Sequence, residues 1–158
     1  MTKKLISDQR FCSGCMACVV NCSQFREGHA APASSRIHID HDPFTGAYIS
    51  RYCTQCEEKA CARNCPAQAI TEIEGGYLKI NYELCTGCQT CIAVCLSAAI
   101  FYDSVTGKVI KCDTCGGDPE CAKVCYTRAL LWIEPEDADT FEREKLQSRY
   151  FIRGKVRP

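Results

Sequence analysis

The stretch LCTGCQTCIAVC, residues 84–95, sets four cysteines at the spacing CxxCxxCxxxC. The same spacing recurs at residues 12–22, close to the start of the chain. Two further groups, at residues 53–65 and 112–125, lengthen the gap before the third cysteine to four and five residues. Together these quartets contain all 16 cysteines of the 158-residue chain: Cys12, Cys15, Cys18, Cys22; Cys53, Cys56, Cys61, Cys65; Cys85, Cys88, Cys91, Cys95; and Cys112, Cys115, Cys121, Cys125. The pattern predicts a protein built around metal.

The spacing is that of bacterial ferredoxins, and it has a physical reason. Three thiolates on a tight loop can reach three irons of one cubane, whereas the fourth, on the next helical turn, points away. The fourth thiolate therefore ligates the other cluster of a pair. Sixteen cysteines then predict four 4Fe-4S clusters with no ligand left over.

Zinc and disulfides are the alternative uses of so many cysteines. Zinc ribbons are closed by four ligands in paired CxxC knuckles, and a third cysteine two residues further on has no role there. Disulfides need an oxidising compartment, but residues 1–10 contain no apolar segment of a secretory signal, and bridges between such close cysteines would be strained. A zinc-binding interaction module stays as a distant alternative.

The composition implies that metal ligation replaces much of the hydrophobic core. The apolar content of 46% includes the 16 cysteines, and a stretch of about 50 to 60 residues buries too little apolar surface to fold unaided. The 19 basic and 19 acidic residues balance, yet sixteen thiolates around four cores of charge 2+ leave about 8 negative charges. The Lys and Arg residues are needed to balance this negative charge, and no basic run stands out beyond that, so we expect no nucleic-acid binding.

Strands, turns and short helices are predicted between the quartets. Hairpins are expected where short apolar strands flank turns that contain glycine, within residues 36–51, 69–81 and 99–110. A closing strand is expected at residues 129–134, and a surface loop at residues 24–35. Short helices are expected at residues 16–25, 59–64, 89–96 and 119–126.

The residues that follow the fourth cysteines depart from the usual ferredoxin pattern. Only Pro66 supplies the proline of a Cys-Pro pair; Ser23, Leu96 and Tyr126 take its place elsewhere and leave the local backbone undetermined. No apolar stretch approaches the roughly 20 residues needed to span a bilayer, and no targeting signal is visible. We therefore expect a soluble, cytoplasmic protein.

Three stretches carry a resemblance to a known family: YCTQCEEKACARNCPAQAI at residues 52–70, LCTGCQTCIAVC at 84–95 and IKCDTCGGDPECAKVC at 110–125. They resemble the four-cluster electron-transfer subunits of molybdenum and tungsten oxidoreductases, such as the dimethyl sulfoxide reductase iron–sulfur subunit. The resemblance covers residues 10 to 134, and the lean size is most similar to the small polyferredoxin subunit of tungsten aldehyde oxidoreductases.

The resemblance implies an α+β fold of two pseudo-symmetric bacterial-type 2×4Fe-4S ferredoxin modules, one nested within the other. Residues 1–50 and 104–134 would form the outer module and residues 51–103 the inner one. Residues 135–158 lie beyond the resemblance; this charged segment contains no cysteine, and its residues predict a partner-binding tail that includes a helix at 136–149. The implied ligand sets are Cys12, Cys15, Cys18 with Cys125; Cys112, Cys115, Cys121 with Cys22; Cys53, Cys56, Cys61 with Cys95; and Cys85, Cys88, Cys91 with Cys65. The spacing alone also allows a tandem arrangement of two ferredoxins.

No residue is placed for bond chemistry, because every quartet is complete and no nucleophile has an evident base partner. The histidines at 29, 38 and 41 and the aromatic side chains of Trp132 and Tyr126 are expected to serve packing. The predicted function is therefore non-catalytic: single-electron relay between a catalytic tungsten or molybdenum pterin subunit and a flavin, NAD-linked or ferredoxin partner. Alternatives are a subunit of a formate dehydrogenase, hydrogenase or benzoyl-CoA reductase complex, or a free soluble polyferredoxin. Self-association of the chain is a further expected contact.

Overall fold

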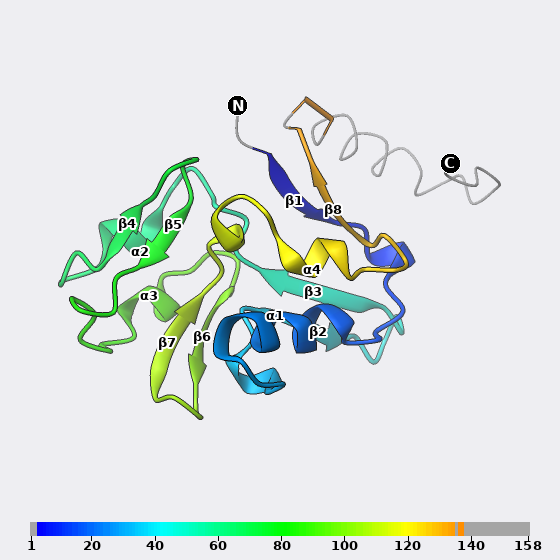
Figure 1. Ribbon diagram of the computed structural model, residues 1–158, viewed down its shortest axis with the longest axis horizontal. Coiled ribbons are helices and arrows are strands. Elements are labelled where there is room, and N and C mark those ends of the chain that lie inside the picture. The colour runs from blue at the N-terminus through cyan, green and yellow to red at the C-terminus, as the bar shows by residue number, and fades with distance from the viewer. Residues whose placement is uncertain (1–2, 135, 138–158) are drawn as a thin grey trace.

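The computed structural model describes residues 3–134 and 136–137. Within them, eight short strands form four separate two-stranded antiparallel sheets (Figure 1). The pairs are β1 (Lys4–Ser7) with β8 (Leu130–Ile133), β2 (Ile37–His41) with β3 (Tyr48–Tyr52), β4 (Ile70–Glu72) with β5 (Leu78–Ile80), and β6 (Ile100–Asp103) with β7 (Lys108–Lys111). The three predicted hairpins are thereby confirmed.

Four short α-helices carry cysteines: α1 (Ala17–Glu27), α2 (Ala60–Arg63), α3 (Thr90–Ala93) and α4 (Glu120–Lys123). Three of them begin directly after a residue in the left-handed region, namely Met16, Lys59 and Gln89, with φ of 62°, 45° and 61°. Such a residue reverses the chain abruptly. The third cysteine of quartets one, two and three is thereby placed in the first helical turn, next to the loop that carries the first two. Before α4 the corresponding residue is Pro119, which is extended with φ of -68°. Three 3-10 turns complete the elements: η1 (Gln9–Phe11), η2 (Pro32–Ser34) and η3 (Thr114–Gly116).

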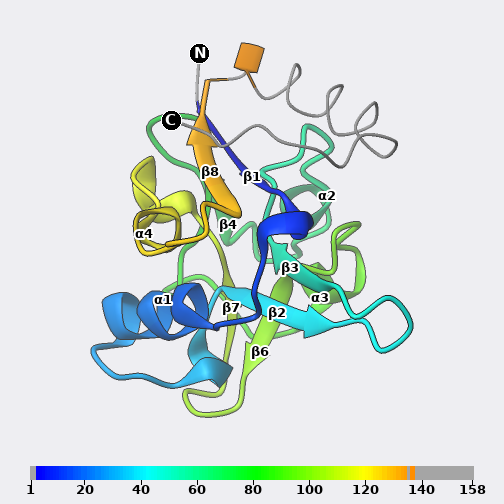
Figure 2. The same ribbon diagram turned by 90° about the vertical axis from the view of Figure 1, so that its right-hand side faces the viewer.

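The predicted closing strand is confirmed as β8, and its partner is the first strand of the chain. Lys4 lies opposite Ile133 and Ser7 opposite Leu130. Figures 1 and 2 both show β1 and β8 side by side. The two ends of the described chain are thus joined by a ladder of backbone hydrogen bonds, a pairing that the sequence did not predict.

The expected surface loop at residues 24–35 is partly wrong. Helix α1 continues through Glu27 and ends at Gly28, whose φ is 76° and whose N–H donates to Gln24 O at 3.0 Å. Farther on, η2 leads into Ser34 and Ser35, which are fully buried. The helix itself was predicted, at residues 16–25, and only its extension through Glu27 was missed, because the polar residues and the exposed Phe25 ring of the last turn leave no apolar periodicity.

The buried side chains form two main clusters, each built partly from cysteines. The first combines the N-terminal third of the chain with its C-terminal part: Leu5, Cys18, Val19, Cys22, Ile37, Tyr52, Cys121 and Leu130. The second comes from the middle of the chain: Cys61, Ile70, Leu78, Ile80, Cys91, Ile100 and Val109. A smaller cluster of Cys53, Ala99 and Cys112 contains residues from both regions.

The predicted tail falls almost entirely outside the described residues, which include only positions 136 and 137 of it. Among the residues that are described, no helix has the length and apolar character of a bilayer span.

Candidate iron–sulfur centres

Three cavities are each lined by four cysteines that come from two different quartets. We refer to these cysteines as set II (Cys22, Cys112, Cys115, Cys121), set III (Cys53, Cys56, Cys61, Cys95) and set IV (Cys65, Cys85, Cys88, Cys91). In each set, three cysteines of one quartet meet the fourth cysteine of another. Apolar side chains complete the walls, for example Ile70, Ile80 and Val109 around set IV.

The remaining cysteines, Cys12, Cys15, Cys18 and Cys125, are set I. Burial raises the pKa of Cys18 to about 12, and the negative charges of Cys125, Cys15 and Cys12 raise it further. Cys18 therefore shares its surroundings with a cysteine from the far end of the sequence. Helix α1, which carries Cys18, packs against α4, which leads to Cys125.

Electrostatic neighbours connect the sets to one another. Burial raises the pKa of Cys121 in set II, and Cys18 of set I contributes to that shift. Burial likewise raises the pKa of Cys112 in set II to about 12, with Cys53 of set III the first of the charges that add to it. In set IV the pKa of Cys91 rises to about 11, mainly through burial and with a contribution from Cys61 of set III. The buried clusters show the same neighbours, since Cys18 packs with Cys121, Cys112 with Cys53, and Cys61 with Cys91. The sets therefore follow one another in the order I, II, III, IV.

The loop between the first two cysteines of each quartet turns through a left-handed residue. The residue immediately before the second cysteine has positive φ in all four quartets: Gly14 (69°), Gln55 (52°), Gly87 (71°) and Thr114 (52°). A right-handed turn would carry the chain on into a helix, whereas the reversal keeps both thiols on one side of the loop.

A second repeated turn follows the fourth cysteine in quartets two, three and four. The residue three positions later is left-handed at Gln68, Ala98 and Arg128, with φ of 50°, 46° and 54°. Each donates its backbone N–H to the carbonyl of that cysteine at 3.0 to 3.1 Å. The turn is the same with Pro66 as without proline, so the backbone left undetermined by Leu96 and Tyr126 is resolved.

Backbone N–H groups also donate to the sulfurs of the fourth cysteines. The donors are Ala69 to Cys65 at 3.3 Å, Ala99 to Cys95 at 3.3 Å, Leu130 to Cys125 at 3.4 Å and Arg36 to Cys22 at 3.4 Å. Such bonds stabilise a thiolate and are among the factors that set cluster potentials.

Quartet one departs from this pattern, because Cys22 lies within helix α1 rather than before a turn. Ser23, which follows it, is fully buried, and its hydroxyl donates to Val20 O at 2.9 Å. Here the helix continues, and the N–H donor to the sulfur comes from Arg36, fourteen residues away.

Cationic side chains lie against sets II and III. Arg26 and Arg36 line the set II cavity; Arg26 forms an ion pair with Asp113, and Arg36 Nη2 lies 2.9 Å from Glu27 Oε1. Burial raises the pKa of Cys61, and the nearby charge of the buried Lys111 side chain opposes that rise. A role for Lys111 was not predicted from the sequence, although its place directly before Cys112 was a usable signal.

The donor sets fit a 4Fe-4S cluster by their chemistry. Four thiols within apolar walls are the ligands and the environment that such a cluster takes. Among the described residues, no three His, Cys, Asp or Glu side chains converge as ligands of one metal ion would. A cubane needs no such convergence, because each thiolate binds a different iron.

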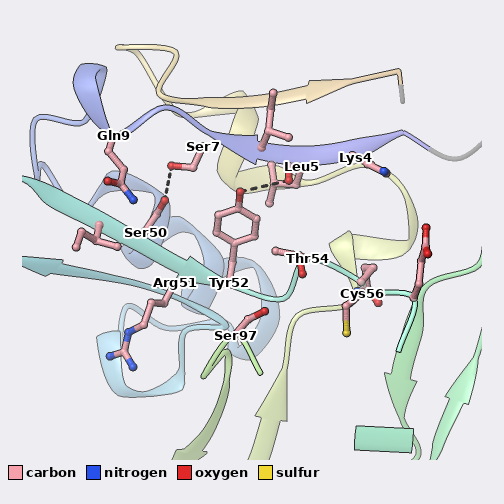
Figure 3. A pocket seen from close by; sticks show the side chains of 14 residues that line it. Lys4, Leu5, Ser7, Gln9, Ser50, Arg51, Tyr52, Thr54, Cys56 and Ser97 are labelled. Atoms are coloured by element: carbon pink, nitrogen blue, oxygen red, sulfur yellow. Dashed lines mark hydrogen bonds between the residues drawn. The ribbon is translucent and has the colours of Figure 1, made fainter. Parts of the chain in front are cut away.

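A larger hollow of about 520 Å³ lies beside set III (Figure 3). Strands β1 and β3 form its walls, and the Tyr52 hydroxyl donates to Leu5 O across it at 3.3 Å. Cys56 lies at its edge together with Ser97. The hollow therefore opens one side of set III towards solvent.

The histidines and large aromatic side chains have structural contacts. The His38 ring lies 3.9 Å from the Phe101 ring, and burial lowers the pKa of His38. His41 packs on Tyr48 with ring centroids 5.2 Å apart, and His29 Nδ1 lies 2.9 Å from Glu27 O.

Two aromatic side chains near the cysteines also make ordinary contacts. Trp132 lies 6.1 Å from the Tyr77 ring, and the Tyr126 hydroxyl is 2.9 Å from Ser13 Oγ. The contact of Trp132 agrees with the predicted packing role, whereas Tyr126 is 71% exposed and meets the loop of quartet one through its hydroxyl.

Residues 44–134 match the family of 4Fe-4S dicluster domains. The chain is 35% identical over 116 residues to the polyferredoxin-like subunit of an aliphatic sulfonate oxidoreductase from Pyrococcus furiosus, a match that covers 73% of this chain and 66% of that protein. It is 31% identical to the B subunit of polysulfide reductase from Wolinella succinogenes, with 98% and 89% covered. The B subunit of the anaerobic dimethyl sulfoxide reductase of Escherichia coli is 28% identical, with 78% and 69% covered.

A solved structure is also similar, that of the active site complex BamBC of benzoyl coenzyme A reductase as isolated. One of its subunits aligns with a TM-score of 0.50 and 26% identity, over 96% of this chain and 92% of that subunit. The predicted resemblance to iron–sulfur subunits of the dimethyl sulfoxide reductase kind is thereby confirmed.

Proposed function

The chain belongs to the 4Fe-4S dicluster domain family, and we propose that it carries four 4Fe-4S clusters as the non-catalytic electron-transfer subunit of an oxidoreductase complex. Sets I to IV are the proposed ligand sets, each holding one cluster. The observation that carries the proposal is the lining of three cavities by four cysteines each, in combinations that cross the quartets.

These combinations support a nested rather than a tandem arrangement. In a tandem pair of ferredoxins, Cys22 would share a cluster with Cys53, Cys56 and Cys61. Instead Cys22 lines a cavity with the first three cysteines of quartet four, Cys112, Cys115 and Cys121. We propose an outer module of residues 1–50 and 104–134 around an inner one of residues 51–103.

The order of the sets supports a linear path for electrons. Each cluster, when bound, takes up and passes on one electron at a time. A chain of this length has a radius of gyration of about 15 Å, so neighbouring sites lie on the order of 10 Å apart. The end sets I and IV contain Cys15 and Cys88, which are exposed. A path that reaches the surface at both ends suits a relay between two partners.

We propose that one partner is a catalytic tungsten or molybdenum pterin subunit and the other a flavin, NAD-linked or ferredoxin protein. Support comes from the relatives, one named a polyferredoxin-like oxidoreductase subunit and another a component of polysulfide reductase. The tail at residues 135–158 contains no cysteine and is the proposed contact with the catalytic subunit.

Iron analysis of anaerobically purified protein tests the cofactor content. We expect about 16 iron and about 16 acid-labile sulfide per chain, because four complete sets bind four cubanes. Zinc in place of iron would favour the alternative of a zinc interaction module. Iron sufficient for only two or three clusters in intact protein would defeat the four-cluster proposal.

Double substitutions test the nested pairing. If Cys22 and Cys112 ligate one cluster, Cys22→Ala combined with Cys112→Ala loses no more iron than either single change. Cys22→Ala combined with Cys53→Ala damages two clusters, so the iron losses add. The opposite result, additive loss for Cys22 with Cys112 and none for Cys22 with Cys53, would establish the tandem arrangement.

A further inference from the structure

Lys111 is a buried cation at the junction of sets II and III. It lies at the end of β7, directly before Cys112, and is only 4% exposed. Its Nζ donates to Leu78 O and Cys112 O, both at 2.9 Å, and lies 3.4 Å from Gln55 Oε1. An ammonium has three protons, and here they meet three oxygen acceptors.

All three acceptors are neutral, so they do not balance the charge of Lys111. Among residues 3–134 and 136–137, none of the ion pairs includes this lysine. A buried charge is costly unless an opposite charge lies near it. The candidates for that opposite charge are the thiolates on either side.

The surroundings of Lys111 place it between the two sets. Leu78, one acceptor, lines the set III cavity. Cys112, whose carbonyl is a second acceptor, belongs to set II and forms a buried cluster with Cys53 of set III and Ala99. A single ammonium thus faces one set on each side.

Gln55 holds this ammonium in place from the loop of quartet two. Its Nε2 donates to Cys112 O at 2.9 Å, while its Oε1 accepts from Leu78 N at 3.0 Å. The same Oε1 lies within reach of Lys111 Nζ. Gln55 therefore bridges the backbone of quartet four and strand β5 and fixes the position of the charge between them.

We propose that Lys111 tunes the path for electrons: its buried ammonium raises the reduction potentials of the clusters at sets II and III relative to those at sets I and IV. The inference rests on the proposed function, since it needs clusters at these sets. Reduction adds one negative charge to a cluster, and an opposite charge nearby in a medium of low dielectric constant stabilises the reduced form. The reduction potentials of the clusters at sets II and III are thereby brought close to each other, which favours passage of the electron between them.

The chain offers a matched control on the same strand. Lys108 is exposed, with its Nζ 5.4 Å from the centroid of the Tyr82 ring. Water screens a charge of this kind strongly. Removal of the Lys108 charge should therefore leave the reduction potentials of all four clusters unchanged, although the change in formal charge is the same as in the Lys111 variants.

The test compares Lys111→Met, Lys111→Gln and Lys108→Met with the unaltered full-length chain. Iron and sulfide are measured first, and each protein is then titrated potentiometrically with dithionite and followed by visible absorbance and EPR. We expect a downward shift of the midpoint potential for about half of the absorbance change in both Lys111 variants, and no shift in Lys108→Met. Glutamine keeps hydrogen-bond donors but not the charge, so equal shifts in the two Lys111 variants assign the effect to charge.

Other outcomes overturn the inference. Wild-type potentials in Lys111→Gln alongside shifted ones in Lys111→Met would assign the effect to hydrogen bonding. A uniform shift of all four clusters, or no shift, would remove the local tuning role. Loss of iron from both Lys111 variants would show that the lysine is required for cluster binding, and it would remove the assigned role in tuning the potentials. Absence of iron from the unaltered protein would instead defeat the proposed function, so the two failures are distinguishable.

Discussion

At the scale of single residues, the cysteine loops depend on residues with positive φ, a backbone conformation that is unfavourable for any residue with a Cβ atom. Gly14 and Gly87 occupy equivalent positions before the second cysteine of quartets one and three, with nearly equal φ of 69° and 71°. Their surroundings differ. A Cβ at Gly14 would overlap the Tyr48 ring, whereas a Cβ at Gly87 would meet nothing within 4 Å. The first loop is therefore held by a tyrosine from β3 and the third is not.

This difference predicts unequal effects of the same substitution. Gly14→Ala and Gly87→Ala both incur the left-handed strain of about 1–2 kcal/mol, but only Gly14→Ala also displaces an aromatic ring. We expect Gly14→Ala to lose about 4 of about 16 irons per chain, while Gly87→Ala keeps nearly all. Iron analysis after anaerobic purification measures the difference.

Tyr48 supplies the control for that prediction. Tyr48→Ala in the Gly14→Ala background should restore iron to the level of Gly87→Ala, because the overlap is gone and only the backbone strain remains. Equal iron in the two single variants would show that the ring moves aside without cost.

At the scale of elements, two of the hairpins close with the same turn. Asp42 accepts a hydrogen bond from Phe44 N at 2.9 Å and another from the Thr45 hydroxyl. Asp103 does the same with Val105 N at 2.9 Å and the Thr106 hydroxyl at 2.6 Å. Burial acts to raise the pKa of Asp103, but the hydrogen bonds outweigh burial and hold this pKa below its usual value. The turns differ in burial, since Asp103 is fully buried.

The difference in burial predicts different losses of stability. Asp103→Ala removes two hydrogen bonds to a buried carboxylate and should lower the free energy of unfolding by about 1–3 kcal/mol. Asp42→Ala should cost less, because water can replace the carboxylate in an exposed turn. Anaerobic guanidinium denaturation followed by circular dichroism compares the two, and an equal or larger loss in Asp42→Ala would contradict the prediction.

The hairpins were predictable because each one is local: its two strands and its turn lie within about sixteen consecutive residues. The pairing of β1 with β8 was not, because Lys4 and Ile133 are brought together only by the fold as a whole. The cysteines of the site were evident from their spacing. The role of Gln55 was hidden, since a polar residue within a loop gives no sign that its amide reaches a backbone carbonyl fifty-seven residues away.

At the scale of the whole molecule, cysteines occur in both of the large buried clusters. Cys18 and Cys121 join the first, and Cys61 and Cys91 the second. If these cysteines bind iron, the metal connects the same segments that the apolar side chains connect. Folding and metal loading are then one process rather than two.

The tail should be separable from that process. Residues 140–158 contain Phe141, Leu146, Tyr150, Phe151 and Ile152 but no cysteine. Deleting them should leave the iron content nearly unchanged and weaken co-purification with the catalytic subunit or with further copies of the chain, because apolar residues spaced along a charged segment are suited to binding a partner.

A substitution variant controls for the shortened length. Phe141→Ser combined with Leu146→Ser should weaken co-purification, whereas Glu142→Gln combined with Lys145→Gln should not. Undiminished recovery of the complex after the deletion would rule out a partner-binding tail, and loss of iron would show that the tail protects a cluster.

The pairing of β1 with β8 has a consequence for synthesis on the ribosome. A nascent polypeptide emerges N-terminus first, so β1 leaves the exit tunnel long before its partner has been translated. The middle segment, with α2, α3 and the β4–β5 hairpin, can fold while β1 still lacks its partner strand β8. Under the proposed pairing, the N-terminal cysteines then stay without their partners in quartet four until translation is nearly finished. A nascent chain that stalls before β8 is synthesised would keep these thiols unprotected, so the N-terminal cysteines are open to oxidation for most of the time that translation takes.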